Sequence, residues 1–172
     1  NRLLTLYVMI VLGLTMGMQP IVGYNFGAQK IDRVKQTLKL GIVSGVVITS
    51  SGFFICELFP HAVSAIFTDS DHLIDLAVDG LRITVIMFPF VGAQIVIGNF
   101  FQSIGKAKIS IFLSLTRQLL YLLPCLLLFP NWWGLKGIWI SMPVSDALAF
   151  ITAVVSLIIY IKKVSKQHPI AE

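Results

Sequence analysis

The chain has 172 residues, of which 56% are hydrophobic and only 12% are charged, and its mean hydropathy is +0.88. Soluble domains carry roughly 25% charged residues, and a core of this size cannot bury so much apolar surface, so the composition excludes an ordinary soluble protein and favours one embedded in lipid. The net charge of +5 does not indicate nucleic acid, because the lysines and arginines mostly flank apolar stretches, as expected at a membrane surface.

Five apolar stretches are long enough to cross a bilayer as helices. They cover about residues 3–22, 37–59, 73–99, 108–129 and 135–161, and a tail follows at 162–172. At 1.5 Å per residue, about 20 residues span a hydrocarbon layer of roughly 30 Å. The sequence therefore predicts an all-α, polytopic membrane helix bundle. Because the chain begins NRLLTLYVMI, without an initiator Met or a signal-peptide layout, we expect it to start within a larger protein.

The first apolar stretch ends in a cluster of helix-bending and hydrogen-bonding residues, GMQPIVGYNFGAQK at 17–30. We expect Pro20 to kink the helix and to free backbone carbonyls near Gln19. Asn25 and the glycines beside it are expected to turn the chain sharply before the basic connector that starts at Lys30. Gln19 and Asn25 are therefore candidates for a substrate or ion pathway.

Small residues at four-residue spacing indicate close helix packing. Such pairs occur at Gly13/Gly17, Gly41/Gly45 and Ser110/Ser114. This spacing lets membrane helices approach closely, so that dispersion and weak hydrogen bonds hold them together. A sliding interface between moving helices is the alternative interpretation.

The orientation follows from the distribution of Lys and Arg among the connections. Nine basic residues fall on one side and two on the other, where aspartates also lie, so the basic side and the C-terminus are predicted to be cytoplasmic. The nine are Lys30, Arg33, Lys35, Lys39, Lys106, Lys108, Lys162, Lys163 and Lys166, and the two are Arg2 and Lys136. The sequence thus predicts a multi-pass protein of the plasma membrane.

The third stretch carries polar residues that are costly in hydrocarbon and therefore need partners or a water-lined cavity. Asp79 and Arg82 lie three residues apart near its outer end and are predicted to form an ion pair there. Gln94, Asn99 and Gln102 lie toward the cytoplasmic end. They either line a water-filled path or form hydrogen bonds between helices.

Arg117 and Asp146 fall near mid-depth on the fourth and fifth predicted helices. Consecutive helices joined by a short loop are usually neighbours, so we expect the two side chains to form an ion pair. A cavity-facing role in gating or substrate binding is the alternative, and both residues are candidates for the substrate or ion pathway. Four prolines are predicted to act as hinges or kinks: Pro20, Pro89, Pro124 and Pro143.

A metal site or an enzyme active site is not expected. His61 and His72 belong to the outer connection and His168 to the tail, so no imidazoles converge at metal-ligand spacing. Cys56 and Cys125 lie far apart in apolar runs and are predicted to be reduced, buried, small hydrophobic residues. No phosphate-binding loop or nucleophile motif is present.

Four segments together resemble the multidrug and toxic compound extrusion (MATE) family of transporters. The pattern Pro20-x-x-Gly23-x-Asn25-x-Gly27-Ala28 resembles the loop that closes the second helix of each half of these proteins. An outer loop of the family and the start of its next helix are similar to LFPHAVSAIFTDSDHLIDLAVDGLRI. The following helix and its cytoplasmic turn are similar to FPFVGAQIVIGNFFQSIGKAKIS. GLKGIWISMPVSDAL resembles the last helix of the family. The segments cover nearly the whole chain.

The resemblance implies a partial C-terminal lobe, with this chain supplying helices 8–12 and therefore five helices of one six-helix lobe. Its partners would be the lipid bilayer, the N-terminal lobe and the first helix of the C-terminal lobe. The implied function is export of cationic or amphipathic drugs by alternating access. Inward flow of protons or sodium ions would drive export, with no cofactor and no enzymatic activity.

One departure from the family pattern concerns the coupling ion. Sodium-coupled members resemble one another in carrying an acidic residue midway along the helix that corresponds to the third stretch. Residues 86–99 contain none, and Ala93 and Gln94 stand near that place. A sodium site within this chain is therefore not expected, and the coupling carboxylate would belong to the first lobe.

Two other functions are compatible with the helices. A lipid-linked saccharide flippase of the same superfamily would share them but usually lines its cavity with several basic residues, whereas Arg117 is the single central candidate here. A non-transporting membrane scaffold is the second alternative. It would need neither mid-depth charges nor several prolines within helices.

Overall fold

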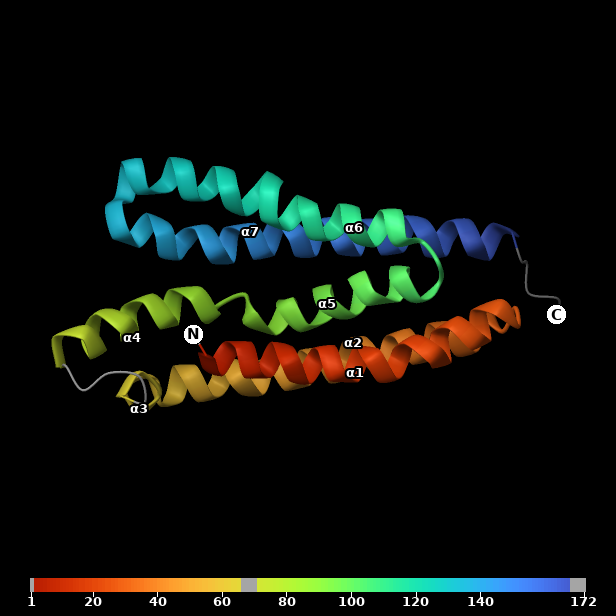
Figure 1. Ribbon diagram of the computed structural model, residues 1–172, viewed down its shortest axis with the longest axis horizontal. Helices are drawn as coiled ribbons and strands as arrows, with labels where there is room; N and C mark the ends of the chain where they lie inside the picture. Colours follow the sequence, from red (N-terminus) through yellow and green to blue (C-terminus); the bar gives the residue numbers. More distant parts are fainter. Residues whose placement is uncertain (1, 66–70, 168–172) are drawn as a thin grey trace.

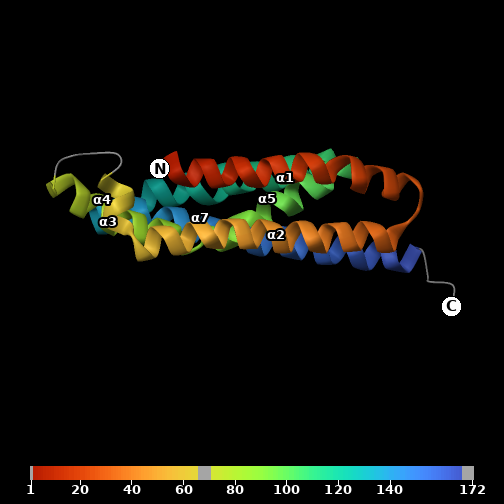
Figure 2. The ribbon, with the colours of Figure 1, turned by 90° about the horizontal axis from the view of Figure 1, so that it is seen from below.

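The computed structural model describes residues 2–65 and 71–167, and these residues form helices and short turns, with no strand among them. The all-α membrane helix bundle predicted from composition is confirmed. In the view of Figure 1, the helix pair α1 and α2 lies at the bottom, α4 and α5 lie in the middle, and α6 and α7 lie at the top. Figure 2 shows α1 and α2 on opposite sides of the bundle, with α5 between them.

The first two helices are α1 (Arg2–Gly27) and α2 (Ile31–Leu58), joined by a short turn. Both differ from the predicted bounds of 3–22 and 37–59. The cluster expected to turn the chain remains helical as far as Gly27, and the basic connector is the first part of α2. The connector is helical because it is amphipathic: Val34 and Leu38, four residues apart, are buried while its charged residues face outward or are half-buried.

The predicted third helix is broken. It comprises α4 (Asp71–Val85) and α5 (Phe88–Ser103), which meet at an angle of 48°. Pro89 lies in the first turn of α5 and has no backbone N–H to continue the ladder from α4, so the predicted kink becomes a full break just before it. A short helix that the sequence did not predict, α3 (Pro60–Ala65), precedes α4.

The remaining chain folds as a helical hairpin. Its first arm contains α6 (Ala107–Leu115), the π-helix η1 (Thr116–Leu122) and the start of α7 (Leu123–Gln167). Within α7 the backbone reverses at Gly134, whose φ of 56° and ψ of −135° favour glycine, and the second arm returns beside the first (Figure 1). The second arm continues to Gln167, past the predicted helix end at 161. Residues 168–172 of the predicted tail lie outside the described residues.

The four predicted prolines differ in their surroundings. Pro124 directly follows the π-helix, and Pro89 follows the break described above. Pro20 and Pro143 lie inside continuous helices, α1 and α7, so their role as hinges stays a prediction.

Three helices in the described residues are long and apolar enough to cross a membrane: Leu4–Gly27, Ile31–Leu58 and Ala107–Val164. The bent pair α4–α5 makes a fourth if it is one broken span. The longest of these helices contains the reversal at Gly134, and five crossings result only if its two arms cross separately. The protein is a multi-pass membrane protein, and the count of five stays a prediction.

Helix α5 forms the centre of the packing, because it contacts α1, α2, α6 and α7. Its Ile97, Phe100 and Phe101 are almost fully buried. They pack in one apolar cluster with residues of α1, α2 and the second arm of α7, including Val22, Leu38 and Ala153. Both cysteines are free, as predicted. Cys56 is buried in a second cluster, as expected, whereas Cys125 is only half-buried, so its predicted burial is wrong.

The basic segments gather at one end of the bundle. The α1–α2 turn, the α5–α6 turn and the end of α7 lie together at the right of Figure 1. These segments carry Lys30, Lys106 and Lys163, three of the residues assigned to the cytoplasmic side. This grouping agrees with a single basic face, while its cytoplasmic position stays a prediction.

Candidate functional site

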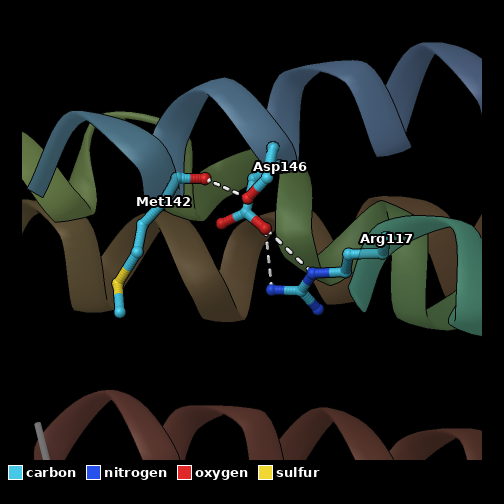
Figure 3. Close-up of polar contacts among 4 residues, drawn as sticks. Arg117, Met142 and Asp146 are labelled. Carbon is cyan, nitrogen blue, oxygen red and sulfur yellow. Dashed lines mark hydrogen bonds and ion pairs between the residues drawn. The ribbon is translucent and has the colours of Figure 1, made fainter. Parts of the chain in front are cut away.

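An ion pair joins the two arms of the α6–α7 hairpin. The Nε of Arg117, on η1, donates a hydrogen bond of 2.9 Å to Oδ1 of Asp146, on the second arm of α7, and its Nη2 lies 2.8 Å from the same oxygen (Figure 3). The Asp146 side chain is 13% exposed and that of Arg117 is 34% exposed. The pairing expected from adjacent helices is thus present, and both contacts use one carboxylate oxygen.

Arg117 lies near the start of the π-helix η1. Leu123 donates its N–H to the carbonyl of Gln118, five residues earlier, where an α-helix would use a residue four earlier. This widened turn rotates the residues that follow it relative to an α-helix, and π-turns of this kind are frequent at functional sites. Tyr121, in the same segment, forms a hydroxyl–hydroxyl hydrogen bond of 2.8 Å with Thr152 of the second arm. Two polar contacts therefore hold η1 against α7.

Two cavities meet at Arg117. One has a volume of about 480 Å³ and is lined by Arg117, Asp146 and Ser145 together with apolar side chains of α1, α5 and α7. The Ser145 hydroxyl donates a hydrogen bond of 2.8 Å to the Met142 carbonyl. The other cavity, of about 280 Å³, is lined by Arg117 and by polar residues of α5. The guanidinium therefore stands where both cavities can be reached.

Polar amides surround the smaller cavity. Gln94, Asn99 and Gln102 all line it. Asn99 also accepts a hydrogen bond of 3.1 Å from Nε2 of Gln19 on α1 and donates one of 3.0 Å to the Ile95 carbonyl. The sequence left two interpretations open, a hydrogen bond between helices and a place in the lining of a path. Asn99 fits both, because it forms a hydrogen bond to another helix and lines a cavity.

Gln94 has an unsatisfied acceptor. Gln94 is only 8% exposed, and its Oε1 has no hydrogen-bond partner within the described part of the chain. A buried amide oxygen without a partner costs free energy, so it marks a place where a ligand or water can supply the missing donor. Gln94 thus offers a buried, neutral acceptor on α5.

The predicted pair of Asp79 and Arg82 is wrong. Arg82 Nε instead lies 3.8 Å from Glu57 Oε1 at the end of α2, and both side chains are about half exposed. The Arg82 side chain leans toward the neighbouring helix, whereas Asp79 on the same helix is exposed and makes no ion pair within the described residues. Spacing along one helix permits the predicted pair, but a carboxylate on α2 lies closer.

The structure separates Asn25 from the other candidates. Asn25 is buried in the last turn of α1, where its Nδ2 donates 2.8 Å to the Ile21 carbonyl, and it lines neither cavity. Gln19 reaches the smaller cavity only through its bond to Asn99. The site therefore contains Arg117, Asp146 and the amides of α5.

Sequence reasoning missed Gln118, which lines both cavities beside Arg117. It also missed Ser145 and Thr84, which line the larger cavity. Gln118 directly follows Arg117 in the sequence, and Ser145 directly precedes Asp146. These positions next to predicted site residues could have identified both as candidates. The π-helix, which carries Gln118, has no comparable signal in the sequence.

The chain matches the MatE family model over residues 1–127. It is 26% identical over 161 residues to the multidrug export protein MepA of Staphylococcus aureus, covering 93% of this chain and 35% of that protein. It is 24% identical over 147 residues to MepA of Staphylococcus haemolyticus, covering 86% of this chain and 32% of that protein. The chain thus spans about a third of the length of these curated relatives.

Two solved structures share its fold. The MATE multidrug transporter DinF-BH is 37% identical with a TM-score of 0.86, covering 92% of this chain and 35% of that chain. An inward-facing MATE family transporter of the MOP superfamily has a TM-score of 0.89, covering 96% of this chain and 39% of that chain. The second is only 20% identical and shows the fold alone.

Proposed function

The chain belongs to the MatE family, and from this premise we propose that it forms part of a cation-coupled multidrug efflux antiporter that works by alternating access. It would supply helices 8–12, most of the C-terminal lobe, while the N-terminal lobe and helix 7 come from the rest of the transporter. The match to about a third of each relative supports this assignment. The basic end would face the cytoplasm and the transporter would lie in the plasma membrane.

The observation that carries this proposal is the Arg117–Asp146 ion pair at the junction of two cavities. Ionisable groups inside a membrane protein are costly and are retained mainly where they serve a pathway or a gate. A purely structural pair would be closed off by packing, whereas this guanidinium borders both cavities. Changing the charge on either partner would break this ion pair and leave the Tyr121–Thr152 hydrogen bond as the other polar contact between η1 and α7. A passing ion or substrate can weaken the hairpin in this way.

The lining of the larger cavity supports an amphipathic substrate. Half of its lining residues are apolar, with Leu4, Val8 and Phe88 among them. The other half supply the Arg117–Asp146 pair and a few hydroxyl and amide groups. Sites of this kind bind molecules with an apolar body and a small number of polar groups. Cationic drugs fit this description, because Asp146 provides a negative charge when they displace Arg117.

The same cavities disfavour the flippase alternative. In the part of the chain that the structure describes, Arg117 is the only lysine or arginine that lines the two cavities. A polyanionic lipid-linked saccharide would leave most of its charge without a partner there, and desolvated charges need partners. The scaffold alternative gives no reason for a charged pair beside open cavities.

The test is dye efflux from cells that express the full-length transporter containing this chain. Cells loaded with ethidium should lose the dye faster than cells with an empty vector, and an agent that collapses the proton or sodium gradient should abolish the difference. Equal dye loss in the two cell types, with the transporter present in the membrane, would contradict the proposed function.

A further inference from the structure

A third cavity lies away from the Arg117 site, at the basic end of the bundle. It has a volume of about 670 Å³ and opens between the α1–α2 turn, the α5–α6 turn, α6 and the last turns of α7. Its wall is mostly apolar and includes Phe26, Phe112 and Ile159. The proposed efflux function does not use this cavity.

The polar part of this cavity is cationic. Lys106, from the α5–α6 turn, and Lys163, near the end of α7, both line it and are both exposed. Among the described residues that line it, none is an aspartate or glutamate. Tyr160 adds a phenolic hydroxyl to the same wall. A ligand in this cavity therefore meets two ammonium groups and no carboxylate.

Two helices begin beside the cavity and add to its positive potential. Neither Lys30, before α2, nor Lys106, before α6, caps its helix with a side-chain hydrogen bond. The first N–H groups of a helix lack partners within the helix and carry partial positive charge. Asp32 in the first turn of α2 offsets part of this effect, but its exposed side chain is not among those lining the cavity.

The apolar wall continues onto the outer surface of the helices. Phe112 is 52% exposed and Ile159 is 63% exposed, and both belong to the apolar segment Ala107–Val164. The cavity thus joins a cationic mouth at the bundle end to an exposed apolar surface of α6 and α7. A soluble anion would use only the first of these features, whereas an anionic lipid would use both.

We propose that this cavity binds an anionic phospholipid, with the phosphate between Lys106 and Lys163 and an acyl chain along Phe112 and Ile159. Basic pockets between transmembrane helices at the cytoplasmic surface bind anionic headgroups, and each lysine near such a surface strengthens binding by about fivefold. The proposal does not depend on the efflux function, because it concerns a different cavity and a binding reaction.

The test titrates the delipidated, purified full-length transporter with dioleoyl-phosphatidylglycerol and counts bound lipids by native mass spectrometry. The double variant Lys106→Gln/Lys163→Gln should bind the lipid about 30-fold more weakly at this site than the wild type. Lys108→Gln removes a nearby exposed lysine that is not among the lining residues and should leave binding unchanged. Dioleoyl-phosphatidylcholine should show no difference between these proteins.

Each other outcome would overturn the proposal. Equal loss of affinity in Lys108→Gln would show a general effect of surface charge. Displacement of the lipid by millimolar inorganic phosphate would show a site for soluble anions. Unchanged binding in the double variant would show that the lipid binds elsewhere. Because both substituted lysines are exposed, gel filtration and thermal unfolding of the variants should match the wild type.

Discussion

Gly92 of α5 lies against Gly45 of α2 so closely that a Cβ atom on Gly92 would overlap the Gly45 carbonyl group. The Thr49 hydroxyl occupies the same contact, 2.9 Å from the Gly45 oxygen and 3.0 Å from the Pro89 oxygen. This crossing places α5 in the middle of the bundle, immediately after its break from α4. The positions of Gln94 and Asn99 therefore depend on it.

Replacing Gly92 by alanine should destabilise the full-length transporter. The added methyl group has no space, and overpacking a helix contact costs about 1–3 kcal/mol. The midpoint of thermal unfolding in detergent should fall. It can be measured by gel filtration of samples heated to a series of temperatures. Gly13→Ala is the matched control, because a Cβ there meets nothing within 4 Å. An unchanged midpoint for Gly92→Ala would contradict the close approach of α2 and α5.

Gln94→Leu should separate stability from function. Because the buried Oε1 has no partner, replacing the amide by an apolar group of similar size should leave the free energy of unfolding unchanged or raise it. Ethidium efflux should fall, since the cavity loses its unsatisfied acceptor. Asn99→Leu is the comparison: it removes the bond to Gln19 and should lower stability by about 0.6 kcal/mol, the average for such bonds in membranes. A clear loss of stability in Gln94→Leu would assign the residue a structural role.

The predicted topology can be checked with single cysteines in a background that lacks Cys56 and Cys125. A cysteine at Gln36 or Gln167 should resist a membrane-impermeant thiol reagent added outside intact cells, because both positions belong to the basic side. A cysteine at Ser70, which lies outside the described residues, should react. The reverse labelling pattern would invert the assigned orientation.

Much of the bundle could be predicted because lipid imposes simple requirements. Apolar stretches of sufficient length must be helical, and a pair of opposite charges on consecutive helices favours contact. The Arg117–Asp146 pair follows from these two rules. The basic connector was predicted poorly because its amphipathic pattern, with Val34 and Leu38 buried, belongs to a helix that continues into α2.

The features that escaped prediction depend on contacts between distant segments. Arg82 pairs with Glu57, which is on another helix, so spacing within one helix could not identify it. The break before Pro89 and the π-helix before Pro124 both involve prolines that were expected to bend their helices. The same residue type thus accompanies a break in one helix and a widened turn in another, so a proline alone does not predict which of the two forms.

The most direct test of the central claim is a double-mutant cycle on ethidium efflux, using Arg117→Ala, Asp146→Ala and the double variant in the full-length transporter. Each single variant leaves an unpaired charge, which costs at least about 2.5 kcal/mol at the centre of a membrane, so each should lower efflux per transporter in the membrane. Removing both charges should restore part of the loss, giving a non-additive cycle. Strictly additive losses, or full activity in both single variants, would contradict a functional ion pair at this site.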